Sequence, residues 1–303
     1  MLKTKLIPPP GKLIRVKGKQ MHIRISGLPG GKTVVFDHGC GYGSYSDTWS
    51  LVEEKVAPFA QTVVYDRAGY GWSEKGSVLR NNEEAVEDLH ELLQAAGVRQ
   101  PFIYVGHSYG GVNARLYAER YPENLAGIVL VDASHEDELT DRFPREHVKG
   151  QKSGILMFRM LYWLTRAGIL KWLLQRNKLK EFEALLKQFP ESIARRMRLM
   201  TPQRATGLAV YQEFKNLQLG YDAVRKKALP PGMPLLVLKS GKVEHLEKVK
   251  VGIADKITSC LLDVAEEMSH LSDQGELVVV EDSGHNIHIE RPDVVAQGIR
   301  QML

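Results

Sequence analysis

The sequence predicts an α/β fold in which helices cover both faces of a mostly parallel β-sheet and a helical cap is inserted. Three observations predict it. Short apolar runs typical of buried strands alternate with segments of helical spacing, as in strand–helix–strand units. One run, residues 102–105, leads through a glycine-rich turn directly into a helical segment. The chain of 303 residues is long enough for one large domain with an insertion, or for two domains.

The first half of the chain contains the regular part of this pattern. Residues 13–16 and 21–25 alternate apolar and polar side chains around a short turn, which predicts an antiparallel hairpin. Buried strands are expected at residues 33–36, 62–65, 102–105 and 127–131. Apolar residues at helical spacing predict a helix over residues 83–96, and Gly97 ends it.

The second half departs from the pattern before it returns to it. Residues 134–230 show helical spacing but no convincing strand, and the proline-rich run at residues 229–232 marks the return to the sheet. The sheet resumes with strands at residues 235–238 and 277–280 and a closing helix at residues 292–303. We therefore expect a core domain of residues 1–133 and 231–303, with residues 134–230 inserted as a helical cap.

The overall composition is that of a globular protein. It is 43% hydrophobic and 25% charged, and no segment approaches the roughly 20 uncharged apolar residues of a transmembrane helix. The N-terminal residues are basic and lack the apolar core of a signal peptide. Cys40 and Cys260 are the two cysteines, which argues against a disulfide scaffold and fits a cytoplasmic location.

The net charge of +5 is unevenly distributed. Residues 134–230 hold 19 Lys and Arg against 10 Asp and Glu, a balance of +9, so the remainder of the chain carries −4. No zinc-binding, RNA-binding or helix-turn-helix pattern accompanies the basic segment. Nucleic acid is therefore not an expected partner.

The glycine-rich turn holds the most informative residue of the chain. It reads Gly106-His107-Ser108-Tyr109-Gly110, the G-x-S-x-G pattern of a nucleophile elbow, and lies between a strand and a helix as that motif requires. The turn holds its serine in a strained conformation at the top of a sheet, where a side chain two residues to either side would clash. The pattern therefore predicts Ser108 as a catalytic nucleophile.

Together with three other segments, the elbow makes the chain resemble the α/β-hydrolase superfamily over nearly its whole length. These segments are Asp37-His38-Gly39-Cys40-Gly41 after a strand, D-R-x-G-x-G-x-S at residues 66–73, and Asp282-Ser283-Gly284-His285 after the last strand. Their order matches the family, so the resemblance implies the α/β-hydrolase fold. It also implies that Asp66 and Arg67 are structural residues that shape the turn beside the oxyanion loop.

The resemblance also implies the base and the oxyanion donors. A serine hydroxyl is a poor nucleophile until a base removes its proton, and the family supplies this base from the loop after the last strand, where His285 stands. Backbone N–H groups must stabilise the negative oxygen of the tetrahedral intermediate. One is expected from Tyr109, at the helix N-terminus after the nucleophile, and the other from Cys40, after the His-Gly pair.

The acid of the triad is left open between two residues. An acid must hold the imidazole of the base in the correct tautomer. The family usually supplies it after the strand at residues 235–238, where this chain offers Glu244 and no aspartate. A minority of the family place it one strand earlier, where Asp132 follows a buried strand. We favour Asp132 and retain Glu244 as the alternative; Asp263 and Asp137 are further candidates.

The cap contains an apolar and aromatic helix with a basic face. Lys152, Arg159 and Arg166 are seven residues apart, so they share one side of this helix. Its other faces either pack within the protein, line an acyl pocket or contact a membrane, since basic charge beside exposed Trp and Leu is typical of interfacial helices. Trp163 of this helix and Trp72 are the candidate substrate-binding residues, although Trp72 can equally pack in the core.

These residues together predict a serine hydrolase of the carboxylesterase or lipase type. The expected substrate is a small-molecule or lipid ester with an apolar acyl group, cleaved through an acyl-enzyme. No cofactor or metal is expected, because the C-x-x-C and H-E-x-x-H patterns are absent. Two alternatives stay open: a carbon–carbon bond hydrolase with the same triad, and a slow ligand-binding or receptor-like protein of this fold. The oligomeric state is left open.

Overall fold

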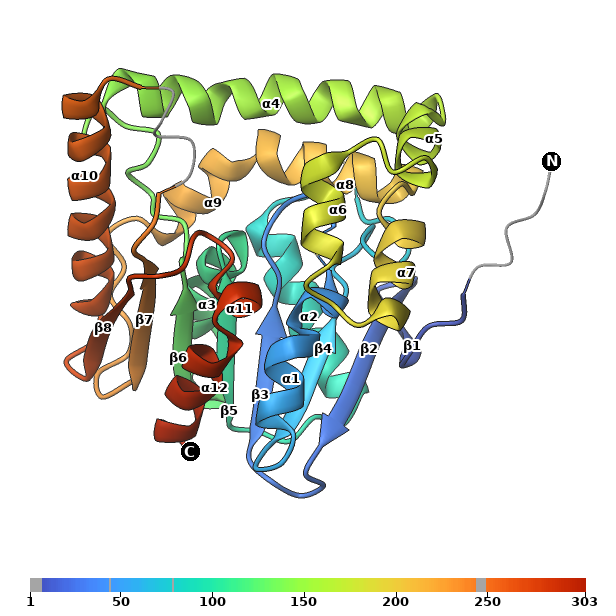
Figure 1. Cartoon of the computed structure of the whole chain (residues 1–303). Coiled ribbons are helices and arrows are strands. Elements are labelled where there is room, and N and C mark those ends of the chain that lie inside the picture. Colours follow the sequence, from blue (N-terminus) through green and yellow to red (C-terminus); the bar gives the residue numbers. More distant parts are fainter. Residues whose placement is uncertain (1–6, 44, 78, 244–248) are drawn as a thin grey trace.

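An eight-stranded sheet lies at the centre of the computed structural model, which describes residues 7–43, 45–77, 79–243 and 249–303 (Figure 1). The strands are β1 (Lys12–Val16), β2 (Lys19–Gly27), β3 (Thr33–Asp37), β4 (Gln61–Tyr65), β5 (Phe102–His107), β6 (Leu125–Val131), β7 (Leu235–Ser240) and β8 (Gly275–Val280). Their order is β1-β2-β4-β3-β5-β6-β7-β8. β2 pairs antiparallel with β1 and β4, and the other neighbouring pairs are parallel. The predicted mostly parallel sheet is confirmed.

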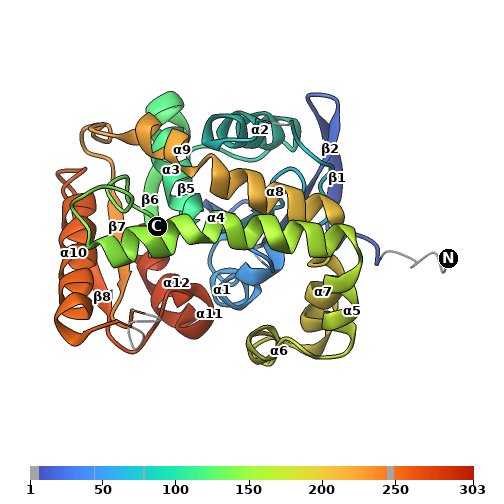
Figure 2. The same cartoon turned by 90° about the horizontal axis from the view of Figure 1, so that it is seen from above.

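Side chains of the central strands alternate between two hydrophobic cores, because successive residues of a strand point to opposite faces. On β3, Val35 packs in one core, and Val34 and Phe36 pack in the other. The first core lies under α2 (Asn82–Ala95) and α3 (Tyr109–Arg120), and the second under α1 (Ser50–Val56) and α12 (Pro292–Gln301). Figure 2 shows these two groups of helices on opposite sides of the sheet, as the sequence predicts.

Six helices, which we call the cap, lie between β6 and β7, where the sequence predicts a helical insertion. They are α4 (Arg145–Arg166), α5 (Ile169–Gln175), α6 (Lys180–Leu186), α7 (Glu191–Met200), α8 (Arg204–Lys215) and α9 (Leu217–Val224). They lie over the carboxyl ends of the parallel strands (Figure 1), the edge at which ligand sites of open α/β sheets form. The bounds of the cap at residues 134 and 230 stay a prediction.

Several helices of the core are absent from the sequence prediction. The largest is α10 (Val251–Ser269), which lies between β7 and β8 along the chain; the others include η1 (Ser46–Trp49), η2 (Pro122–Asn124) and α11 (Ile287–Glu290). The signal for α10 was present, since its buried residues Ile257, Val264 and Met268 recur at helical spacing. Across the described parts of the chain, no helix combines the length and apolar character needed to cross a membrane.

Candidate active site

Ser108 stands on a sharp turn between β5 and α3, at the carboxyl edge of the sheet. Its backbone has φ 53° and ψ −116°, a conformation that is strained for a residue other than glycine. A Cβ on Gly106 would lie 2.3 Å from the carbonyl oxygen of Gly110, and a Cβ on Gly110 would lie 2.6 Å from that of Asp37. Both glycines are therefore required by close backbone approach, as the elbow motif predicts.

The structure joins His285 to Asp132. His285 follows β8, and its Nδ1 lies 2.6 Å from Oδ2 of Asp132, which follows β6. Because a carboxylate accepts hydrogen bonds, Nδ1 is the protonated ring nitrogen, and Nε2 is left as the nitrogen that can accept a proton. Both residues line the same pocket as Ser108, so the predicted nucleophile, base and favoured acid meet at one place.

The other carboxylate oxygen of Asp132 is held by the end of β7. Oδ1 accepts hydrogen bonds from Nζ of Lys239 and from the hydroxyl and backbone N–H of Ser240, the last two at 2.9 and 3.0 Å. Burial alone would raise the pKa of Asp132, but the hydrogen bond with His285 and the charge of Lys239 hold this pKa well below its ordinary value. Asp132 is therefore a fixed anion behind the imidazole.

Of the other candidate acids, the structure describes Asp137 and Asp263, and both lie in other surroundings. Glu244, the alternative, lies outside the described residues. Asp137 forms ion pairs with Arg142 and Arg225, and Asp263 is exposed on α10. The contact with His285 therefore favours Asp132.

The predicted oxyanion donors, Cys40 and Tyr109, line the same pocket. Tyr109 begins α3, where backbone N–H groups have no partner within the helix. The loop after β3 approaches the nucleophile closely, since a Cβ on Gly39 would lie 3.3 Å from Cβ of Ser108. The thiol of Cys40 donates to the carbonyl oxygen of Val210 on α8, and burial raises the pKa of this thiol well above its ordinary value. The backbone of Cys40, not its thiol, suits the predicted role.

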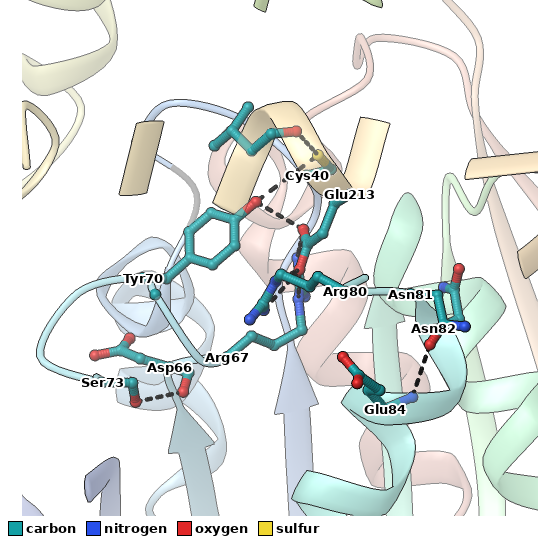
Figure 3. Close-up of polar contacts among 12 residues, drawn as sticks. Cys40, Asp66, Arg67, Tyr70, Ser73, Arg80, Asn81, Asn82, Glu84 and Glu213 are labelled. Atoms are coloured by element: carbon teal, nitrogen blue, oxygen red, sulfur yellow. Dashed lines mark hydrogen bonds and ion pairs between the residues drawn. The ribbon is translucent and has the colours of Figure 1, made fainter. Parts of the chain in front are cut away.

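The buried guanidinium of Arg67 holds the loop after β3 in place. It forms an ion pair with Asp37, and it donates hydrogen bonds to the carbonyl oxygens of His38 and Gly39. On its other edge, Nε and Nη2 donate to the two carboxylate oxygens of Glu213, both at 2.9 Å (Figure 3). Arg67 is thus structural, as expected, and it connects the loop to α8 of the cap.

Glu213 is the centre of this connection. It also accepts hydrogen bonds from Tyr70 at 2.7 Å and from Arg80 at 2.8 Å (Figure 3). Burial alone would raise its pKa, but the charges of Arg67 and Arg80 lower the pKa of Glu213 to about 2. The sequence analysis missed Glu213, because its partner Arg67 lies 146 residues away along the chain and no local pattern connects the two.

The pocket that contains Ser108 has a volume of about 520 Å³ and lies between the sheet edge, the cap and α10. The segment before α10 and α10 itself supply an apolar wall that consists of Val249, Ile257, Leu261, Val264 and Met268. The cap and the segment that leads into it add Phe214, Leu217 and Tyr221, together with the polar side chains of Glu138, His147 and Gln151. The pocket therefore has an apolar side and a polar side.

The two tryptophans predicted as substrate-binding residues lie away from this pocket. Trp163 is 57% exposed on the outer side of α4, where it lines a separate groove. Trp72 donates from its indole N–H to the carbonyl oxygen of Ile7, and its ring packs against His22 and Tyr45. The structure corrects this prediction, because the sequence does not indicate which side of α4 faces the core.

His107 packs beside His285, and His288 packs on the ring of His107. The ring centroids of His107 and His288 are 4.3 Å apart, and Nε2 of His107 lies 3.0 Å from the carbonyl oxygen of His285. Burial lowers the pKa of both rings, that of His288 to about 3. Both are therefore neutral rings that support the loop of His285.

Comparisons with known proteins agree with this fold. A family model described as the alpha/beta hydrolase fold matches residues 32–292. The chain is 27% identical over 285 residues to the uncharacterized protein YqjL of Bacillus subtilis, across 94% of this chain and 88% of that protein. It is 28% identical over 123 residues to Lipase 1 of Psychrobacter immobilis, across 40% and 38%. A thermophilic esterase from Thermogutta terrifontis has a TM-score of 0.65 at 20% identity, with 95% of each chain covered.

Replacement of Glu213 by glutamine is expected to destabilise the fold, because it leaves two buried guanidinium groups against an uncharged partner. We expect Glu213→Gln to lower the free energy of unfolding, measured by urea denaturation at neutral pH, by about 3 kcal/mol. Glu54 is exposed on α1, and Glu54→Gln is the matched control, with an expected change within about 0.5 kcal/mol.

The pH dependence of stability separates the effect of the charge of Glu213 from the effect of its packing. Because the pKa of Glu213 is lowered from 4.5 to about 2, its carboxylate stabilises the fold above the ordinary pKa, and this contribution is lost as the pH falls toward the lowered value. The difference in stability between wild type and Glu213→Gln should therefore shrink between about pH 5 and about pH 2. A difference that stays constant over this range would contradict an electrostatic role.

Proposed function

The chain belongs to the alpha/beta hydrolase fold family, and on this premise we propose that it is a serine hydrolase that cleaves carboxylic esters with apolar acyl groups. One observation carries the proposal. Ser108, on its strained turn, shares a pocket with His285, and Nδ1 of His285 is hydrogen-bonded to the buried anion of Asp132. This arrangement has a nucleophile, a base and a group that orients the base, as acyl transfer requires.

In the proposed acylation step, Nε2 of His285 removes the hydroxyl proton while Oγ of Ser108 attacks the ester carbonyl carbon. The anion of Asp132 stabilises the imidazolium that forms. The backbone N–H groups of Cys40 and Tyr109 stabilise the negative charge on the former carbonyl oxygen. The intermediate then breaks its bond to the alcohol oxygen, and the alcohol leaves with the proton from His285.

Deacylation repeats the same proton transfers with water. His285 removes a proton from a water molecule as its oxygen attacks the acyl carbonyl carbon. The second intermediate breaks its bond to Oγ of Ser108, which takes back the proton from the imidazolium. The carboxylic acid leaves, and the free serine is restored.

The apolar wall formed by α10 supports the choice of acyl group. Each CH₂ group that moves from water into such a wall contributes about 0.8 kcal/mol. Val264 and Met268 are buried and line the same pocket as Ser108. An acyl chain that extends from Ser108 along α10 would therefore be favoured over a charged one.

The first test is hydrolysis of a p-nitrophenyl ester by wild type and Ser108→Ala. Removal of the nucleophile should lower kcat by several orders of magnitude, because only binding and oxyanion stabilisation remain. Ser134 lines the same pocket, and Ser134→Ala is the matched control that should keep kcat within about tenfold of wild type. Hydrolysis that survives in Ser108→Ala would refute the mechanism, and an inert wild type would favour a ligand-binding protein.

The second test concerns the acid. Asp132→Asn should lower kcat by about 10⁴-fold with little change in KM, because the amide no longer fixes the tautomer or stabilises the imidazolium. Glu244→Gln should stay near wild type. Because Asp132→Asn also leaves the buried ammonium of Lys239 without its anion, thermal unfolding must show that the variant is folded at the assay temperature. The assignment fails if Glu244→Gln, rather than Asp132→Asn, loses activity.

The third test concerns the acyl wall. Leu261 lines the pocket, so Leu261→Trp should fill part of it and lower kcat/KM for long acyl esters more than for acetyl esters. We expect a loss of about tenfold or more for the long chains, because several CH₂ groups lose their apolar contact. Leu262→Trp is the matched control, since Leu262 is 37% exposed on the same helix and does not line the pocket. An equal loss for both chain lengths in Leu261→Trp would contradict this acyl site.

A further inference from the structure

The outer side of the cap exposes a cluster of six large apolar side chains. They are Leu156, Met157, Met160 and Trp163 of α4 and Ile169 and Trp172 of α5, which we call the outer cap face. Four of them are more than half exposed: Leu156 (59%), Met160 (56%), Trp163 (57%) and Trp172 (51%). Exposed apolar patches of this kind mark sites of contact with another surface.

The outer cap face lies on the second half of α4 and on α5. Helix α4 lies uppermost in Figure 1, and in the view from above it lies across the molecule with α5 at one end (Figure 2). Its 22 residues make it about 33 Å long. Part of the face forms a groove of about 930 Å³ that is lined by residues such as Met160, Trp163 and Tyr211 and shares none with the Ser108 pocket.

The charge of this region has a single sign. Residues 147–180 contain eight Lys or Arg and no Asp or Glu. On α4, Lys149, Lys152, Arg159 and Arg166 are exposed and recur at helical spacing beside the apolar residues. These four form no ion pair with any residue that the structure describes, so their charge is available to an external partner.

The aromatic rings of the face lie beside these cations. The guanidinium of Arg166 lies 5.0 Å from the ring centre of Trp163, and that of Arg176 lies 5.7 Å from the ring centre of Trp172. Indole rings beside Arg and Lys are typical of helices at a membrane surface, where the rings enter the acyl boundary and the long basic side chains reach the headgroups.

Other occupants fit the same face poorly. A second copy of this chain would bring two arrays of unpaired cations together, which like-charge repulsion opposes. The core of a protein interface is depleted in lysine, whereas Lys149 and Lys152 lie on the exposed side of α4. A layer of negative headgroups over an apolar interior complements both the charge and the apolar side chains.

We propose that the outer cap face docks α4 and α5 flat on a lipid bilayer that contains anionic headgroups. Docking would use exposed residues that play no part in the chemistry of Ser108. The docking proposal therefore stands independently of the proposed function. It has a consequence for the site, because the first turns of α4 also supply His147 and Gln151 to the Ser108 pocket. The same helix would then lie between the bilayer and the pocket.

Vesicle sedimentation of the full chain tests this proposal. The wild type should bind phosphatidylcholine vesicles that contain phosphatidylserine, and bind pure phosphatidylcholine vesicles much more weakly. The basic-face variant is Lys149→Gln/Lys152→Gln/Arg159→Gln/Arg166→Gln. Its partition onto anionic vesicles should fall by nearly three orders of magnitude, because each of the four cations contributes about fivefold near an anionic surface.

A matched variant controls for total charge. Lys187, Arg195, Arg204 and Lys215 are exposed cap residues outside α4 and α5. The variant Lys187→Gln/Arg195→Gln/Arg204→Gln/Lys215→Gln removes the same charge and should keep nearly all of the binding. An equal loss in both quadruple variants would overturn the proposal, since it would show attraction to net charge without a docking face.

The apolar part is tested by Leu156→Ser/Met160→Ser/Trp163→Ser. This variant should lose binding to anionic vesicles, and the shift in tryptophan fluorescence that vesicles cause in the wild type should become smaller. Circular dichroism and hydrolysis of a water-soluble ester check that each variant is folded, and they separate failure of docking from failure of the proposed function. Absence of vesicle binding by the wild type would overturn the proposal. So would a stable dimer that this triple variant abolishes, because the face would then be an interface between copies.

Discussion

The buried guanidinium of Arg67 is the interaction on which the geometry of the candidate site depends. Removal of a guanidinium from water costs several kcal/mol unless its donors are matched by acceptors. Here its planar donor groups meet Asp37 and the carbonyl oxygens of the oxyanion loop on one side and Glu213 on the other. Asp37 is held in turn by Tyr104 and Asn113. The loop and the cap are thus positioned by one group, and neither can shift without leaving a buried charge unpaired.

The sheet supplies the second constraint, because it fixes the nucleophile and the acid on neighbouring strands. Ser108 and Asp132 both have positive φ, 53° and 40°, which costs about 1–3 kcal/mol for each residue. The backbone N–H of Ser108 donates to the carbonyl oxygen of Val131, and that of Asp132 donates to the carbonyl oxygen of Leu238. Ser108 and Asp132, although strained, therefore continue the backbone hydrogen bonding between neighbouring strands beyond the strand ends. Because β5 and β6 are neighbours, a histidine that is hydrogen-bonded to Asp132 also lies in the pocket of Ser108.

What the sequence predicted follows from local signals, and what it missed depends on distant contacts. The strands and the elbow around Ser108 have patterns of apolar spacing and glycine that can be read within a few residues. Glu213 and Lys239 carry no such pattern, since their roles depend on Arg67 and Asp132, each more than 100 residues away. The position of Trp163 could not be predicted either. Helical periodicity groups side chains on a face, but on a helix that is apolar on most sides it does not indicate which face is covered.

The helix α4 has apolar side chains on both its inner and its outer side. On its inner side, Phe158 packs against Phe214 with ring centres 4.7 Å apart, as expected for a helix that covers the core. On its outer side, Trp163 and Met160 remain in contact with water, which costs about 25 cal/mol for each Å² of apolar surface left unburied. The fold gains nothing from this exposure, and polar residues at these positions would preserve the inner contacts. The proposed docking would account for the outer side chains, since it gives them an apolar surface to contact, and the unpaired cations beside them favour one that is negatively charged.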